Sequence, residues 1–211
     1  MVNGLFQKVY VITCESFFTR QTYISQHFAQ NNIQFEFRSA VQTSAIKSSM
    51  ISDSEASLVL AHLHCIVDAK LNKYNQILIC EDDVELCDDF NQKLDSFIEQ
   101  VPVDWQFLQL GNQYWATHWL TRDYIKPNLY RFRWGTGSHC VAIKNTAYDN
   151  SINILSKLSS PVDLLYYELF SKLNCYCPEQ FLADALSKND HLQHSDKKYI
   201  FDSSIIHKNV D

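Results

Sequence analysis

Residues 76–83, Gln-Ile-Leu-Ile-Cys-Glu-Asp-Asp, decide how the rest of this chain is interpreted. The aliphatic run is typical of a buried strand, and three carboxylates, Glu81, Asp82 and Asp83, stand at its carboxyl end. Adjacent carboxylates repel one another and resist desolvation unless a positive group lies among them. Since ligands of open α/β sheets bind beyond the carboxyl ends of strands, the pattern favours a divalent cation with a phosphate-bearing ligand. The alternative is a solvated acidic turn before a helix that starts near Asp88.

Length and composition indicate one folded domain. A chain of 211 residues is large enough to bury a core, and 46% hydrophobic with 13% aromatic residues is typical of a globular protein. The net charge of −6 disfavours a nucleic-acid partner. It also means that any bound phosphates need a metal or local cations to offset their charge.

The cysteines and the lack of long apolar segments bear on location. The seven cysteines form no CxxC pair and lie mostly in apolar segments, which predicts buried free thiols in a reducing compartment. No signal-peptide pattern stands at the N-terminus, and no apolar span approaches about 20 residues. We therefore expect a cytoplasmic protein, or one peripheral at a membrane surface, without a transmembrane segment.

Strand and helix patterns alternate along the first part of the chain and predict an α/β layered fold. A capping box, Ser52 with Glu55, opens one helix, and Ser160-Pro161 opens another. The segment 113–134 is rich in Tyr, Trp and Arg and has no clear period. The expected strands are 8–13, 34–41, 76–80, 105–110, 138–144 and 174–176, and the expected helices are 20–30, 52–69, 88–100, 145–158 and 160–170.

Seven segments, in order, resemble glycosyltransferase family 25, which includes lipooligosaccharide-modifying transferases and collagen hydroxylysine galactosyltransferases. The resemblance extends from about residue 8 to residue 180. Ser54 replaces a glycine that is usual in the family, and Ala61 replaces a serine before His62. The segments are VYVITCESFFTRQTYI, FEFRSAV, SDSEASLVLAHLHCIVDAK, ILICEDDVEL, WQFLQLGN, GTGSHCVAIKNTAYDNSI and PVDLLYYELF.

The resemblance implies an α/β fold of the GT-A, Rossmann-like type, with a mixed, mostly parallel central sheet flanked by helices. One domain would span residues 1–211, with a nucleotide-sugar half at about 1–112 and an acceptor half at about 113–211. The implied reaction transfers a hexose, galactose or glucose, from a UDP-sugar with inversion. The acceptor would be a hydroxyl of a glycan, a lipooligosaccharide or a hydroxylysine-type group.

The acidic triplet would correspond to the DxD-like element of such enzymes, where Mn²⁺ or Mg²⁺ bridges the diphosphate. We expect Asp83 to ligate the metal, with Glu81 on the metal or on the ribose. His207 is the candidate third ligand, and His191 and His194 are weaker alternatives.

Further residues are expected to bind the nucleotide sugar together with Glu81 and Asp82. Thr13 and Arg20 flank the turn after the first strand, and Val41 ends the second strand. Gly137 and His139 follow from the glycine pair 135–137, which lets the backbone approach the sugar. His62, on an apolar helix stripe, is expected to be a core histidine.

Inversion needs a carboxylate that takes the proton of the acceptor hydroxyl, and Asp163 in the PVD segment is the candidate base. Alternatively, its charge only complements the helix dipole. Trp115 and Trp134 are expected to bind an acceptor sugar, with Trp119 and Tyr124 as further aromatic candidates. The substitute bases are Asp184, Glu168 and Glu179.

Two other functions fit parts of the pattern. A phosphoryl-transfer enzyme of the haloacid dehalogenase type also places acids after a buried strand, but it needs an aspartate where Glu81 stands. A non-catalytic domain that binds a nucleotide sugar or carbohydrate is the main alternative. Binding without transfer or hydrolysis would identify it.

Overall fold

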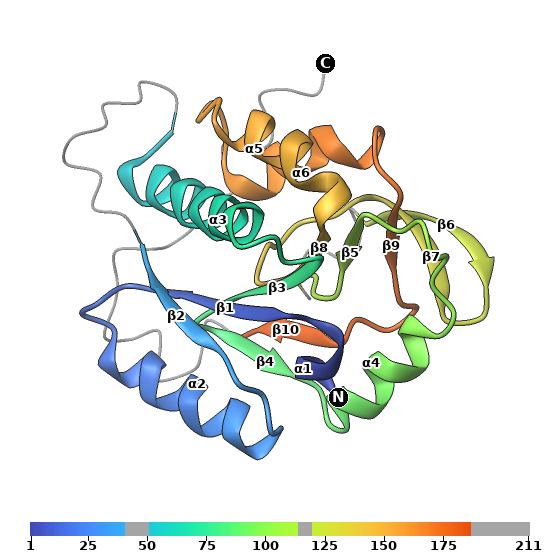
Figure 1. Cartoon of the computed structure of the whole chain (residues 1–211), viewed down its shortest axis with the longest axis horizontal. Helices are drawn as coiled ribbons and strands as arrows, with labels where there is room; N and C mark the ends of the chain where they lie inside the picture. The colour runs from blue at the N-terminus through green and yellow to red at the C-terminus, as the bar shows by residue number, and fades with distance from the viewer. Residues whose placement is uncertain (41–50, 114–119, 187–211) are drawn as a thin grey trace.

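The structure is a computed structural model in which residues 1–40, 51–113 and 120–186 are described (Figure 1). Its helices are α1 (Val2–Leu5), α2 (Phe18–Gln30), α3 (Asp53–Leu71), α4 (Phe90–Ile98), the 3-10 turn η2 (Asn145–Ala147), α5 (Tyr148–Leu155) and α6 (Val162–Phe170). Its strands are β1 (Lys8–Thr13), β2 (Glu36–Ser39), β3 (Gln76–Glu81), β4 (Val84–Leu86), β5 (Phe107–Gln109), β6 (Thr121–Lys126), β7 (Leu129–Trp134), β8 (Cys140–Lys144), β9 (Cys175–Cys177) and β10 (Ala183–Ala185).

The central strands are apolar along their length because both faces of the sheet are covered. In β3, Ile77 and Ile79 pack into one hydrophobic cluster, while Leu78 and Cys80 pack into a second cluster on the opposite face. Side chains alternate between faces along a strand, so Glu81 continues the face of Ile77 and Ile79. This alternation directs Glu81 toward the helices on that face.

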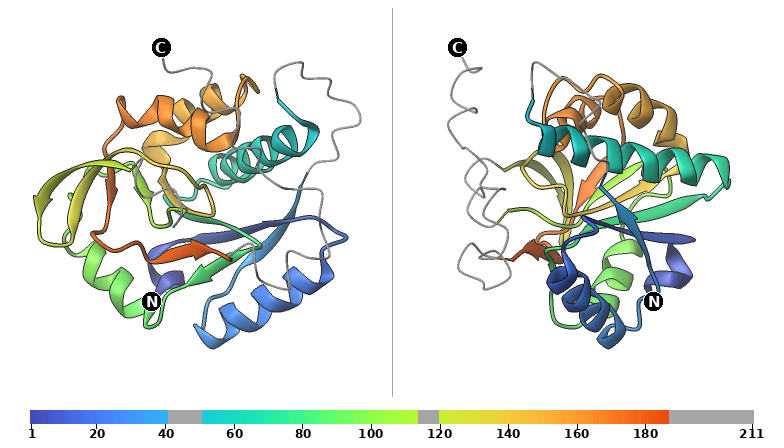
Figure 2. Two further views of the ribbon diagram at one scale, coloured as in Figure 1. Left: turned by 180° about the vertical axis from the view of Figure 1, so that it is seen from behind. Right: turned by 90° about the vertical axis from the view of Figure 1, so that its left-hand side faces the viewer.

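Eight strands form one sheet in the order β2-β1-β3-β8-β5-β9-β7-β6. The pairs β1–β2, β1–β3 and β5–β9 are parallel, and the other pairs in this sheet are antiparallel. Helices α3, α5 and α6 cover one face, and α2 and α4 lie on the other side (Figures 1 and 2). The predicted α/β class, a mixed central sheet flanked by helices, is confirmed.

Local sequence signals account for several element boundaries. The predicted capping box at the start of α3 is present, with Ser52 and Glu55 satisfying each other's backbone N–H groups. The predicted Ser160 cap is wrong, because α6 begins at Val162 with Pro161 as its cap residue, and no side chain caps it. The helix after residue 88 likewise begins two residues later than expected, at Phe90.

The aromatic segment without a clear period contains an unpredicted hairpin, in which β6 and β7 pair antiparallel around the positive-φ residue Asn128. The structure also adds a small two-stranded sheet of β4 and β10, which the sequence patterns did not predict. The Cα partners Asp184 and Glu85 lie opposite each other in it. These short strands depend on tertiary pairing rather than on local pattern.

The thiol prediction holds for the apolar segments, where the free cysteines Cys65, Cys80, Cys140, Cys175 and Cys177 are buried. Within the described part of the chain, no helix combines the length and apolarity needed to cross a membrane.

Candidate functional site

The candidate site lies where several strands end at one edge of the sheet. Thr13 ends β1, Glu81 ends β3 and Gln109 ends β5, and all three strands run in the same direction. The antiparallel strand β8 begins at this edge, with Ser138 and His139 just before it. The carboxyl ends of strands in open α/β sheets are where such folds bind ligands.

Asp82 is anchored inside the protein. Its Oδ2 accepts a hydrogen bond from Thr13 Oγ1 at 2.6 Å, and its Oδ1 accepts one from Arg20 Nη1 at 2.8 Å. Burial raises the pKa of the Asp82 carboxyl, although Arg20 and Thr13 act in the opposite direction. Thr13, Arg20 and Asp82, three predicted nucleotide-sugar ligands, are therefore brought together and bonded to one another.

Asp83 is the member of the triplet with an oxygen left over. Its Oδ2 lies 3.8 Å from Arg20 Nη1, while its Oδ1 is buried and has no hydrogen-bond partner among the described residues. Burial and the charge of Glu81 raise the pKa of Asp83 to about 7, despite the nearby arginine. A cation at Oδ1 would relieve both the desolvation and the repulsion.

Glu81 is held through one oxygen. Its Oε1 accepts a hydrogen bond from Ser138 Oγ at 2.5 Å and lies 3.7 Å from His62 Nε2. Burial acts to raise the pKa of Glu81, but His62, Ser138 and the nearby His139 outweigh it, and the pKa is lowered. The pKa of Glu81 is therefore shifted in the opposite direction to the pKa values of its two neighbours, which burial raises.

The loop between β7 and β8 is held against this edge by a buried amide. Gln109 Nε2 donates to the carbonyls of Gly111 at 2.5 Å and Gly137 at 2.6 Å. Gly137 has a φ of +98°, which a residue with a side chain rarely adopts. The imidazole of His139 fills the space beside both glycines, since a Cβ on Gly111 would overlap His139 Nε2. His139 is 2% exposed, and burial lowers its pKa.

Asp163 joins the same cluster from α6, where it lies in the first turn. Its carboxylate accepts hydrogen bonds from the N–H groups of Leu164 and Gly137. Burial raises the pKa of Asp163, and the charge of Glu81 adds to this rise. The predicted base and the acidic triplet are thus neighbours in space, although they lie far apart in the sequence. Their closeness is compatible with catalysis as well as with helix capping.

Two aromatic side chains lie beside this cluster. Trp134, the last residue of β7, contacts the ring of Tyr167 at 6.4 Å between centroids and an angle of 89°. Tyr167 is 50% exposed and follows Asp163 by one helical turn. Tyr124 lies instead on the β6–β7 hairpin, packed against Tyr130. The predicted residues Val41, Trp115, Trp119, His191, His194 and His207 lie outside the described residues.

The metal prediction can be tested on the donors present. Among the described residues, no group of three His, Cys, Asp or Glu side chains is arranged to hold a metal ion. Glu81 and Asp83 nevertheless fit a metal ion that has only some of its ligands from the protein, because Asp83 Oδ1 is buried and has no hydrogen-bond partner among the described residues. Mg²⁺ typically binds through one or two carboxylates and completes its shell with phosphates and water.

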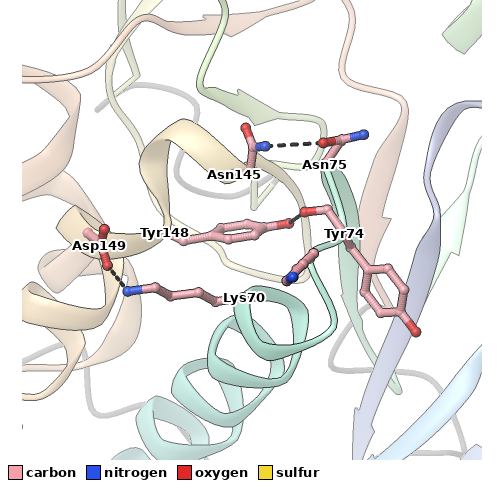
Figure 3. A pocket seen from close by; sticks show the side chains of 7 residues that line it. Lys70, Tyr74, Asn75, Asn145, Tyr148 and Asp149 are labelled. Carbon is pink, nitrogen blue, oxygen red and sulfur yellow. Dashed lines mark hydrogen bonds and ion pairs between the residues drawn. The ribbon is translucent and has the colours of Figure 1, made fainter.

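A cavity of about 270 Å³ lies at the opposite end of β3 (Figure 3). Its lining includes Tyr74 and Asn75, just before β3, and Lys70 pairs there with Asp149. Tyr148 donates to the Tyr74 carbonyl at 3.0 Å. This cavity contains none of the predicted site residues.

Sequence reasoning missed Gln109, Ser138 and the contact of His62 with Glu81. A glutamine inside the apolar strand pattern WQFLQL was a signal for Gln109, because a buried amide must find hydrogen-bond partners. The substitute bases are placed as well. Asp184 lies on β10, Glu168 pairs with Lys157 at 2.5 Å, and Glu179 is exposed.

Comparisons with known proteins show which family the chain belongs to. The model of glycosyltransferase family 25 (LPS biosynthesis protein) matches residues 6–160. No curated protein matches the chain. Similar solved structures include a glycosyltransferase involved in the glycosylation of the major capsid of PBCV-1, with TM-score 0.47, 10% identity and 81% of each chain covered.

Two further structures are similar at the same level. A197 from STIV has a TM-score of 0.44 and 12% identity, covering 81% of this chain and 80% of that chain. Mannose-1-phosphate geranyltransferase from Thermus thermophilus has a TM-score of 0.45 and 10% identity, covering 81% of this chain and 72% of that chain. Likenesses of this size carry no conclusion about the activity of this chain.

Proposed function

Because the chain belongs to glycosyltransferase family 25 and is a glycosyltransferase, we propose that it is a metal-dependent, inverting hexosyltransferase that uses a UDP-sugar. The acceptor is a hydroxyl of a glycan, a lipooligosaccharide or a hydroxylysine-type group. The observation that carries this proposal is that Asp163 and Glu81 meet at one sheet edge, where the Gly137 N–H donates to Asp163 and Ser138 donates to Glu81.

The donor side is assigned to Asp83 and Glu81. Mn²⁺ or Mg²⁺ held by these carboxylates would neutralise charge on the departing diphosphate. Arg20 adds a positive charge at the same edge, 3.8 Å from Asp83, while its bond to Asp82 keeps it in place.

The chemical step is assigned to Asp163. The acceptor oxygen attacks the anomeric carbon as the bond from that carbon to the diphosphate oxygen breaks, and UDP leaves. The acceptor proton passes to the Asp163 carboxylate. The N–H groups of Leu164 and Gly137 fix the orientation of this carboxylate, so that its position does not depend on a flexible rotamer.

The acceptor side is assigned to the right-angled pair of Trp134 and Tyr167. Aromatic faces suit the C–H face of a pyranose ring, and the tyrosine hydroxyl can bond to sugar hydroxyls. Since Tyr167 lies one helical turn after Asp163, a sugar on this pair would have its hydroxyls near the base.

The test is a thermal-shift panel of UDP-sugars with Mn²⁺ or Mg²⁺. We expect one metal–donor combination to raise the melting temperature of the wild-type protein, and Asp83→Ala to abolish the shift. Glu85→Ala is the matched control, because Glu85 is an exposed carboxylate two residues further along. The donor assignment fails if no metal-dependent shift occurs with any nucleotide sugar. A shift without transfer or hydrolysis would identify a binding domain instead.

A further inference from the structure

His62 is buried yet polar, and its surroundings do not match those of an ordinary core histidine. It lies on α3 with no exposed surface, facing the end of β3. Its Nε2 lies 3.7 Å from Glu81 Oε1, and its Nδ1 lies 3.0 Å from the hydroxyl of Tyr166 on α6. The His62 and Tyr166 rings meet edge to face at 5.6 Å. A single imidazole therefore connects Glu81 to the helix that carries Asp163.

The chemistry of the two neighbours determines which ring nitrogen carries the proton. An ionised carboxylate only accepts hydrogen bonds, so the nitrogen facing Glu81 must be the donor. Nδ1 is then the acceptor, and Tyr166 must donate to it. The opposite arrangement would point the lone pair of Nε2 at the carboxylate.

The burial of Tyr166 also indicates that its hydroxyl donates to His62 Nδ1. Its side chain is 1% exposed, and its ring packs against Phe107 at 5.1 Å. Within the described ranges, its hydroxyl has His62 Nδ1 as its only hydrogen-bond partner. If Nδ1 carried the proton, the Tyr166 hydroxyl hydrogen would be buried without an acceptor, which is unfavourable.

We propose that Tyr166 and His62 form a buried positioning relay, in which Tyr166 O–H donates to His62 Nδ1 and His62 Nε2–H is directed at Glu81 Oε1. Ser138 donates a hydrogen bond to the same oxygen. Glu81 Oε1 is thereby held by the protein, and Oε2 is left for the metal or the ribose. The functional part of this proposal rests on the proposed donor site.

Nitrogen chemical shifts and long-range couplings in ¹⁵N-labelled, metal-free protein show which ring nitrogen of His62 carries the proton. We expect the neutral ring of His62 to carry its proton on Nε2, and Tyr166→Phe to remove this preference. His27 provides an internal control of the opposite kind, because its Nε2 accepts from the Leu86 N–H at 2.9 Å and its proton must be on Nδ1. A neutral wild-type His62 with its proton on Nδ1 overturns the relay. An unchanged tautomer in Tyr166→Phe removes Tyr166 from it.

The functional consequence is measured as Mn²⁺ affinity in the presence of UDP, by electron paramagnetic resonance of free Mn²⁺. We expect His62→Leu to weaken Mn²⁺ binding about 10-fold, the lower end of what an outer-shell partner contributes. His62→Gln should restore most of the affinity, because its amide can also direct an N–H group at Glu81. His27→Gln, a histidine control that bonds to the Leu86 N–H and not to a side chain of the triplet, should leave the affinity unchanged.

The two levels of the proposal fail in different ways. If wild-type protein binds no Mn²⁺ with UDP but His62 has the expected tautomer, the donor function is wrong and the relay stands. If wild-type protein binds Mn²⁺ and His62→Leu binds it equally well, the positioning role is wrong and the donor function stands. If His62→Leu and His62→Gln both lose affinity to the same extent, an N–H group directed at Glu81 is not what matters, and the relay is again overturned.

Discussion

Arg20 donates a hydrogen bond to Asp82 across 2.8 Å, and this ion pair joins the first turns of α2 to the turn after β3. The side chains are only 14% and 7% exposed. Thr13 binds the second oxygen of Asp82, so both carboxylate oxygens are occupied by the protein. Asp82 thus holds the edge of the sheet together, whereas its neighbour Asp83 retains an oxygen for a ligand.

Arg20→Leu should destabilise the fold by about 3 kcal/mol, because breaking a buried ion pair leaves the partner charge uncompensated. Urea denaturation of the metal-free protein measures the loss. The double variant Arg20→Leu with Asp82→Asn should recover a large part of it, since the uncompensated carboxylate is gone. Strictly additive losses in the double-variant cycle would contradict a direct pair.

Asp83→Asn should make the metal-free protein more stable at high pH only. The pKa of Asp83 is raised from 3.8 to about 7, so ionisation opposes folding. Well below pH 3.8 the carboxyl is protonated in both states and contributes nothing. The penalty grows between about pH 4 and pH 7 and is constant above that.

We therefore expect the melting temperature of Asp83→Asn to exceed that of wild type by a few degrees at pH 8, with the two values converging near pH 4. Thermal unfolding across this range measures the difference. If the difference in melting temperature between the variant and wild type were the same at all pH values, the pKa of Asp83 would not be raised by its surroundings. This gain in stability at a functional position would come with the loss of metal-dependent donor binding.

The central strands could be predicted from the sequence because their residues are almost all apolar, which indicates burial on both faces. The apolar 77–80 segment, Ile-Leu-Ile-Cys, indicated a strand covered on both faces. The capping box at Ser52 marked the start of α3 through local hydrogen bonds alone. The hairpin of β6 and β7 was missed because its inward side is set by β9, a strand that comes much later in the chain. Residues whose partners lie far away in the sequence leave little local periodicity to read.

The same distinction applies to the site. The acidic triplet was visible because three charges after a buried strand conflict with the local pattern. The roles within it were not visible, since it took the fold to bring Thr13 and Arg20 to Asp82 and to bring His62 and Ser138 to Glu81. His62 was interpreted as a core residue because its place on an apolar helix face predicts only that it is buried. The sequence pattern does not show which groups the buried side chain contacts.

Gly111→Ala should destabilise the protein by about 1–3 kcal/mol, the usual cost of overpacking, because the new methyl group would overlap the ring of His139. The matched control is Gly4→Ala in α1, where a Cβ meets nothing within 4 Å. That change should leave stability equal or slightly higher, since alanine favours a helix. Denaturant midpoints compare the two variants, and equal losses would show that Gly111 has no packing constraint of its own.

Tyr167→Ala should raise the KM for the acceptor with little change in the KM for the donor. The side chain is half exposed beside Trp134, and among the described residues it makes no hydrogen bond or ion pair with the acidic triplet. Tyr124→Ala is the control, because Tyr124 is also exposed and also packs edge to face on an aromatic ring, but on the hairpin. If both variants change the acceptor KM equally, the aromatic pair beside Asp163 is not the acceptor site.

Asp163→Asn should reduce kcat for transfer about 100-fold to 10,000-fold while leaving UDP-sugar binding intact. Asparagine keeps the size of the side chain and can still accept the hydrogen bonds of Leu164 and Gly137, but it cannot take a proton. In wild type, activity should fall as pH drops through the pKa of Asp163, and burial places this fall above the ordinary aspartate range. The residual activity of Asp163→Asn should lack that acidic limb. A variant with full activity and an unchanged pH profile would assign the base to another carboxylate, with Asp184, Glu168 and Glu179 to be tested in the same way.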